Sequence, residues 1–141
     1  MRTIKFRGKS ILNGEWVYGN LVNPSERIFI FTAKHICLEV DKETVGQFIG
    51  LNDKDGNEIY EGDILDFNGI TVEVRFVRGV FAFLANGNLD EELCGDCRTD
   101  LFAKVIGNIY ENSDRLKGGK KWIGNNSSYK WAYVKDLIPK G

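Results

Sequence analysis

The chain has 141 residues, which suits one domain or one domain with an appendage and excludes two full-size domains. Apolar residues make up 43% and aromatic residues 12%, enough to close a core, so a chain disordered throughout is excluded. Nineteen Lys and Arg against twenty Asp and Glu give a net charge of −1, which excludes a generally polyanion-binding protein and makes any charge argument local.

Glycine-containing turns divide the chain into short pieces and predict a mainly β protein. Sixteen glycines accompany only two prolines. Asparagine, aspartate and glycine tolerate the positive φ of tight hairpins. The strongest turn pairs are Asn13-Gly14, Asp55-Gly56, Asn68-Gly69 and Asn86-Gly87. The expected strands are 15–22, 28–32, 36–40, 46–51, 63–67, 70–77, 80–84 and 105–110.

The best-supported element is an antiparallel meander over residues 63–84. In residues 70–77, Ile70, Val72, Val74 and Phe76 alternate with Thr71, Glu73 and Arg75, which predicts one apolar and one charged face. Helical periodicity is scarce. Residues 88–93 could form one or two helical turns, because their acidic residues would face the positive end of the helix dipole.

Charge is distributed unevenly along the chain. Residues 39–66 hold nine acidic and two basic residues, whereas residues 115–141 hold seven basic residues and one acidic residue. The basic tail also carries Trp122, Tyr129, Trp131 and Tyr133. We therefore predict a boundary near residue 114, with a β domain at 1–114 and a basic, aromatic extension at 115–141.

The location of the protein follows from what its sequence lacks. No signal-like apolar stretch follows Met1, and no apolar run approaches the ~18 residues of a membrane span. Three cysteines, an odd number, favour reduced thiols over a disulfide framework. We expect a cytoplasmic protein that does not enter the membrane.

Three segments resemble the YopX-like family of bacteriophage and prophage proteins. They are Lys5-Phe6-Arg7-Gly8 followed by Gly14-Glu15-Trp16-Val17-Tyr18-Gly19, the long motif at residues 46–64, and Val105-Ile106-Gly107-Asn108-Ile109-Tyr110-Glu111-Asn112. Their order and spacing match too, and the resemblance covers residues 4–114. It implies a small β-barrel or roll of SH3-like type, encoded by a phage or by a prophage in a bacterial host. It implies no enzyme activity and supplies no catalytic or ligand-binding residues.

The middle motif also has a purely structural interpretation. Asp55-Gly56 closes a tight turn, Ile59 and Tyr60 anchor it, and Glu61-Gly62 turns the chain again. A calcium loop that starts at Asp53 fails, because its sixth residue is not glycine and its twelfth is not glutamate. A solvated hairpin turn is the expected alternative.

Metal and thiol chemistry depend on a single histidine and three cysteines. Cys94 and Cys97 form a CxxC, and a Cys3His zinc site would need Cys37 and His35 as well. His35 and Cys37 alternate, so both are expected on one strand face. The preferred interpretation is reduced thiols in a surface loop, with no metal and no cofactor. No third group orients a Cys37–His35 nucleophile pair, so no catalytic residue is predicted and the protein is not expected to be an enzyme.

The tail carries the main binding signal. Lys120, Lys121 and Trp122, together with Tyr129, Lys130 and Trp131, interleave cations with aromatic rings, as proteins that bind single-stranded nucleic acid do. The favoured alternative is packing of these rings on the chain's own barrel or on a neighbouring subunit.

The sequence therefore predicts a non-catalytic binding or assembly module that self-associates as a homo-oligomer, with an unknown phage or host protein as a further possible partner. A nucleic-acid-binding phage accessory protein is the second hypothesis, and a zinc-stabilised or thiol-active protein is the third.

Overall fold

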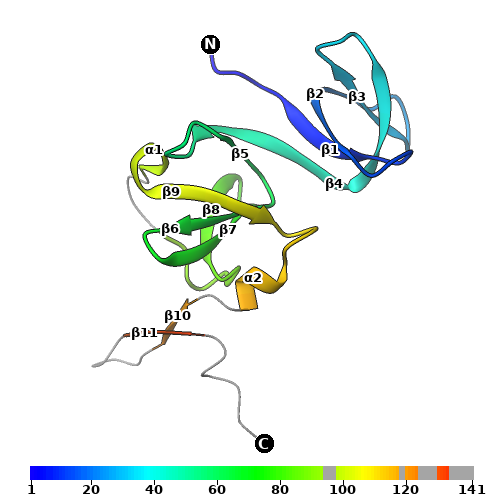
Figure 1. Ribbon diagram of the computed structural model, residues 1–141. Helices are drawn as coiled ribbons and strands as arrows, with labels where there is room; N and C mark the ends of the chain where they lie inside the picture. The colour runs from blue at the N-terminus through cyan, green and yellow to red at the C-terminus, as the bar shows by residue number, and fades with distance from the viewer. Residues whose placement is uncertain (94–97, 118–119, 124–129, 134–141) are drawn as a thin grey trace, which may run out of the picture. The chain divides into compact units, whose positions relative to one another are not determined.

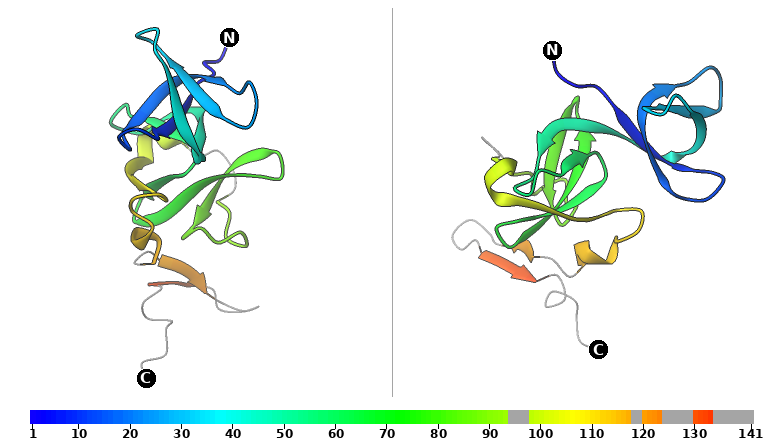
Figure 2. Two further views of the ribbon diagram at one scale, coloured as in Figure 1. Left: turned by 90° about the vertical axis from the view of Figure 1, so that its right-hand side faces the viewer. Right: turned by 45° about the horizontal axis from the view of Figure 1, so that its top comes forward.

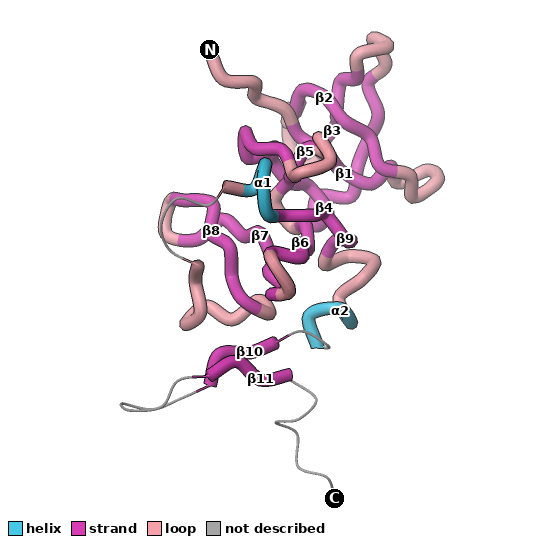
Figure 3. The backbone as a smooth tube through the Cα atoms, turned by 60° about the vertical axis from the view of Figure 1, so that its left-hand side comes forward, coloured by secondary structure: helices cyan, strands magenta, loops and turns pink. Residues whose placement is uncertain are grey.

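Strands dominate the computed structural model of the chain (Figure 1). The structure describes residues 1–93, 98–117, 120–123 and 130–133. In these residues two helices occur, α1 (Thr99–Phe102) and α2 (Asp114–Lys117), each of four residues, and Figure 3 draws them in cyan. The sheets are antiparallel, so the predicted mainly β class with little helix is confirmed.

The described chain divides into two compact units, and the division falls within the middle motif. The barrel unit comprises Met1–Leu51 with Glu58–Glu61, and the meander unit comprises Asn52–Asn57 with Gly62–Gly141. The boundary at residue 114 stays a prediction.

Four strands of the barrel unit form a closed ring. Each of the first three is hydrogen-bonded to the next, and β4 returns to pair with β1, so none of the four is left as a sheet edge. A short fifth strand is added beside β4. The strands are β1 (Phe6–Ser10), β2 (Trp16–Val22), β3 (Ile28–Thr32), β4 (Cys37–Asn52) and β5 (Glu58–Tyr60).

Buried apolar side chains stabilise the strand ring of the barrel unit. Ile30, Val40, Phe48, Ile59 and Tyr60 are buried, so the predicted anchoring role of the middle motif is confirmed. The predicted strands 36–40 and 46–51 are one continuous strand, β4, whose pairing with β1 shifts register at a bulge. The SH3-like type of this ring stays a prediction.

The meander unit contains the predicted 63–84 element. Its sheet has the order β8-β7-β6-β9, built from β6 (Asp63–Phe67), β7 (Ile70–Val77), β8 (Val80–Ala85) and β9 (Ala103–Asn108). The hairpin turn between β6 and β7 places Asn68 at φ 52° and Gly69 at φ 88°, the positive values that a type I′ turn requires. The meander prediction is confirmed.

Burial along β7 departs at two positions from what an apolar inner face and a charged outer face would give. Glu73 is only 4% exposed, whereas Phe76 is 52% exposed. Gly87 and Leu116 of α2 lie next to Glu73, so the second face of the sheet is covered there. Phe76 lies near the hairpin end of β7, where it pairs with Phe81 of β8.

The predicted helix at residues 88–93 is wrong as well. Leu93 N donates to Phe83 O, Ala85 N donates to Glu91 O, and Leu84 and Glu92 form a β-bridge. The Asn88 side chain accepts from Asp90 N instead of capping a helix. The segment therefore extends the edge of β8, because these bonds satisfy backbone groups that the edge would otherwise expose.

The tail contributes a two-stranded hairpin, β10 (Lys120–Ile123) with β11 (Lys130–Tyr133), drawn in orange and red in Figure 2. Among the residues that the structure describes, no helix has both the length and the apolar character needed to cross a bilayer.

Candidate binding groove at the barrel mouth

A cavity of the barrel unit lies at the open end of the strand ring. Its volume is about 520 Å³. The register pairs Val40 of β4 with Ser10 of β1 on one side and with Ile28 of β3 on the other, and directly paired residues project from the same sheet face. Val40 and Ser10 are buried. These three residues therefore form a floor, which we call the mouth floor.

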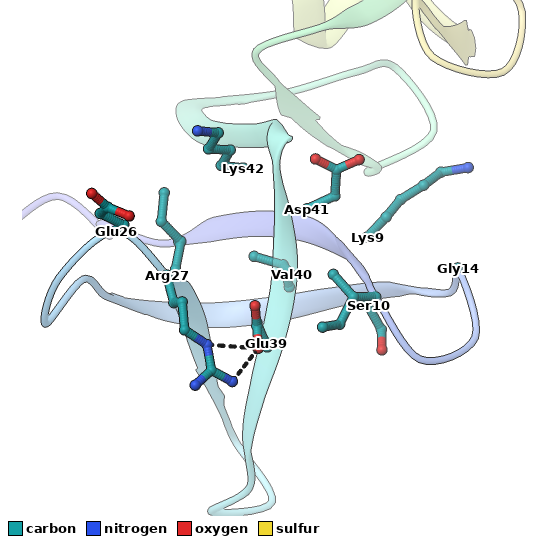
Figure 4. Close-up of a pocket in the computed structure, with 11 residues that line it drawn as sticks. Lys9, Ser10, Gly14, Glu26, Arg27, Glu39, Val40, Asp41 and Lys42 are labelled. Atoms are coloured by element: carbon teal, nitrogen blue, oxygen red, sulfur yellow. Dashed lines mark hydrogen bonds and ion pairs between the residues drawn. The ribbon is translucent and has the colours of Figure 1, made fainter.

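Charged side chains surround this floor and form the mouth rim. Figure 4 shows Glu26 and Arg27 on one side of β4, with Lys9, Ser10 and Gly14 on the other. The rim combines three cations with three carboxylates, so it carries no net charge. Its members are Lys9, Arg27, Lys42, Glu26, Glu39 and Asp41.

One ion pair within the rim has defined geometry. Arg27 donates to Glu39 Oε1 from Nε at 3.1 Å and from Nη2 at 2.5 Å. The hydrogen bond and charge of Glu39 raise the pKa of Arg27 above its ordinary value. The guanidinium also lies 5.3 Å from the centre of the Phe29 ring. The Glu39 carboxylate and the Phe29 ring thus hold Arg27 at the rim.

Two of the rim carboxylates already have hydrogen-bond partners within the chain. Asp41 Oδ1 accepts from Glu43 N at 3.0 Å, and Glu39 is committed to Arg27. No histidine or cysteine is among the described residues that line the mouth. A groove of this kind suits an apolar side chain flanked by charges of both signs.

A second cluster, the stack around Arg7, was not predicted from the sequence. The buried Arg7 guanidinium lies 4.6 Å from the Trp16 ring centre and 5.1 Å from that of Tyr60. Its Nη2 donates to Glu61 O at 3.4 Å. The available signal was the family motif, since Arg7, Trp16, Tyr60 and Glu61 all belong to its quoted segments. The stack joins β1, β2 and β5.

Glu58 extends the stack toward the surface. It forms an ion pair with Lys5 and a 3.2 Å hydrogen bond with the Tyr60 hydroxyl. Burial raises the pKa of Tyr60 well above its ordinary value, and the neighbouring Glu58 charge raises it further. Tyr60 therefore stays neutral, and the cluster ties the motif segments together.

Asp53 occupies a structural corner and is not solvated, contrary to expectation. The residue is 2% exposed. Oδ1 accepts from Asp55 N and Asn57 N, while Oδ2 accepts from Asn57 Nδ2 and Val105 N. Burial raises the pKa of Asp53, but these bonds outweigh it and hold the pKa below its ordinary value. Because both of its oxygens accept two hydrogen bonds, the Asp53 carboxylate closes the turn.

The proposed zinc ligands are only partly described. His35 lies in a turn at φ 62°, outside β4, so the expectation that it shares a strand face with Cys37 is wrong. Its ring lies 5.8 Å from Phe31, and both residues line a cavity of about 400 Å³. Cys94 and Cys97 lie outside the described residues. In the part of the chain that is described, no three His, Cys, Asp or Glu residues group as metal ligands.

The tail residues predicted to bind nucleic acid lie on one hairpin. Lys120, Lys121 and Trp122 belong to β10, while Lys130 and Trp131 belong to β11. The register pairs Trp122 with Trp131. Tyr129 lies outside the described residues. The backbone therefore brings the two sequence segments together.

Comparisons with known proteins identify relatives by sequence and by fold. A family model described as YopX protein matches residues 5–117. No curated protein matches the chain. The crystal structure of protein EF1440 from Enterococcus faecalis is similar, with a TM-score of 0.53 at 24% sequence identity, and the match covers 82% of this chain and 99% of that one. At this identity the likeness concerns the fold alone.

Proposed function

The chain belongs to the YopX family, and we propose that it is a non-catalytic binding and assembly module that self-associates through its barrel mouth. One observation carries the proposal: an open cavity of about 520 Å³ combines an apolar floor with a charge-balanced rim. Mouths of β-barrels are common binding sites, and balanced charges select orientation without repelling a partner of either sign. A phage or prophage origin, which rests on the family resemblance, and a cytoplasmic location, which rests on the composition of the sequence, belong to the same proposal.

Chemical considerations support binding over catalysis at this site. Ser10 Oγ accepts from Leu12 N, and the described lining offers it no histidine as a general base. Glu39 is neutralised by Arg27. The pKa of Arg27 is raised by the hydrogen bond and charge of Glu39, so this guanidinium stays charged and is no general base.

The test is the mass of the full chain in solution, measured by sedimentation equilibrium over a wide range of concentration. We expect a mass above the 16.0 kDa of one chain. Arg27→Glu should weaken the association, because it reverses one rim charge opposite Glu39. Arg98→Glu is the matched control, since Arg98 forms a comparable exposed pair with Asp100 in the meander unit. A chain that stays monomeric at every concentration refutes the proposal.

Nucleic-acid binding by the tail is the second candidate function. The observation that favours it is the hairpin register, which places three lysines and the Trp122–Trp131 pair on two adjacent strands. Phosphate contacts release counterions, so binding of a single-stranded oligonucleotide should weaken steeply as salt rises. It should vanish when Lys120, Lys121 and Lys130 are changed to glutamate. If the full chain binds no oligonucleotide at low salt, this candidate is eliminated.

A further inference from the structure

The turn between β1 and β2, residues 11–15, presents two aliphatic side chains to solvent. Ile11 is 54% exposed and Leu12 is 82% exposed. Figure 2 shows this blue hairpin standing out from its strand ring. Turns of this kind are usually polar, whereas this turn carries two adjacent exposed aliphatic residues.

Hydrogen bonds fix the shape of the turn. Gly14 N donates to Ser10 O and Ser10 N donates to Glu15 O, both at 2.9 Å. Leu12 N donates to Ser10 Oγ at 3.2 Å, and Glu15 N donates to Asn13 Oδ1 at 3.0 Å. Because the backbone is already ordered, burying Leu12 in a partner loses little conformational entropy.

The turn and the mouth lie side by side on one surface. Ile11 and Gly14 line the mouth, whereas Leu12 does not, so the Leu12 side chain does not fill the chain's own cavity. One face of the barrel unit therefore carries both an apolar projection and an apolar-floored hollow. A surface with both features is complementary to itself under a two-fold rotation, the commonest symmetry of protein dimers.

We infer that two copies of this chain pair about a two-fold axis, with Leu12 of each copy inserted into the barrel mouth of the other. The inference rests on the proposed function and names its partner. The rim charges support a second copy, because three cations and three carboxylates let two identical rims meet without net repulsion. Exposed Glu15 on the turn then meets Lys42 on the rim of the opposite copy.

The first experiment compares Leu12→Asp with the wild-type full chain by sedimentation equilibrium. The dissociation constant should rise at least about a hundredfold, because a two-fold interface loses one buried leucine from each copy. The matched control is Leu89→Asp, a 49% exposed turn leucine of the meander unit, which should leave the constant unchanged. Circular dichroism and thermal unfolding should show that both variants fold.

The second experiment reverses charges. Glu15→Lys alone and Lys42→Glu alone should each weaken the dimer, and the double variant should restore it. If the wild-type chain associates but Leu12→Asp associates equally well, the reciprocal insertion is overturned while the assembly module stands. If the double variant fails to recover, the two-fold arrangement is overturned. If the wild-type chain is monomeric throughout, the proposed function itself fails.

Discussion

Asp53 offers the sharpest test of how the middle motif is held. Oδ2 of its carboxylate accepts from Val105 N at 2.9 Å and from Asn57 Nδ2 at 3.3 Å, while Oδ1 accepts from two backbone N–H groups of the turn. In Asp53→Asn, one oxygen keeps the turn bonds, but an NH₂ group faces the donors of Val105 and Asn57. Each buried donor left unsatisfied costs about 1–3 kcal/mol. We therefore expect Asp53→Asn to lower the free energy of unfolding by about 2–4 kcal/mol.

The effect should depend on pH with a defined sign. The hydrogen bonds lower the pKa of Asp53 in the folded state. A group of this kind contributes stability above its unfolded pKa, about 3.9, and this contribution is lost as the pH falls through the lower folded value. The gap between wild type and Asp53→Asn should therefore be largest at neutral pH and should narrow in acid.

Urea denaturation at pH 7 and at a series of lower pH values measures both effects. Asp55→Asn is the matched control, since it changes an exposed carboxylate of the same turn and should have little effect. If Asp53→Asn is as stable as the control, or if the gap widens in acid, the carboxylate does not hold this corner and the argument is wrong.

Three further substitutions test the packing. Gly46→Ala should cost about 1–3 kcal/mol in thermal unfolding, because its Cβ would lie 2.5 Å from Glu61 O, and an unchanged midpoint would show that the strands have room to separate. Arg75→Ala should cost about 1–2 kcal/mol in urea, since it leaves buried Glu73 without its bidentate partner, and a further Glu73→Gln change should recover part of the loss. Burial raises the pKa of Tyr60 in the folded state, so the neutral phenol stabilises the fold below its unfolded pKa of about 10, and this contribution should decline as the pH rises further. Unfolding of Tyr60→Phe at alkaline pH, compared with wild type, should lack that decline.

Local patterns were sufficient to predict most strands. The predicted ranges 28–32, 63–67 and 70–77 coincide with β3, β6 and β7. The predicted turn pairs Asn68-Gly69 and Asn86-Gly87 have positive φ at both residues, and they turn the chain directly after β6 and after β8. Period-two alternation was the signal for residues 70–77.

Features that depend on distant partners were missed. The polar run at Asp41–Glu43 interrupts the apolar pattern and suggested a break, yet β4 continues through it because β1 pairs with both halves. β1 and β5 are short; β1 gains its bonds from β2 and β4, and β5 gains its bonds from β4. The acidic segment 88–93 favours a helix in isolation, but the edge of β8 offers better use of its backbone groups.

The class of fold, the positions of the hairpins and the family could all be predicted from the unfolded chain, because each is encoded by neighbouring residues or by the order of short motifs. Three arrangements became visible only in the folded chain: β4 closes a ring with β1, Val40 lies in the floor of the mouth between Ser10 and Ile28, and Arg7 stacks between Trp16 and Tyr60. Those arrangements join residues of different strands, and contacts between strands carry no periodic signal along the chain.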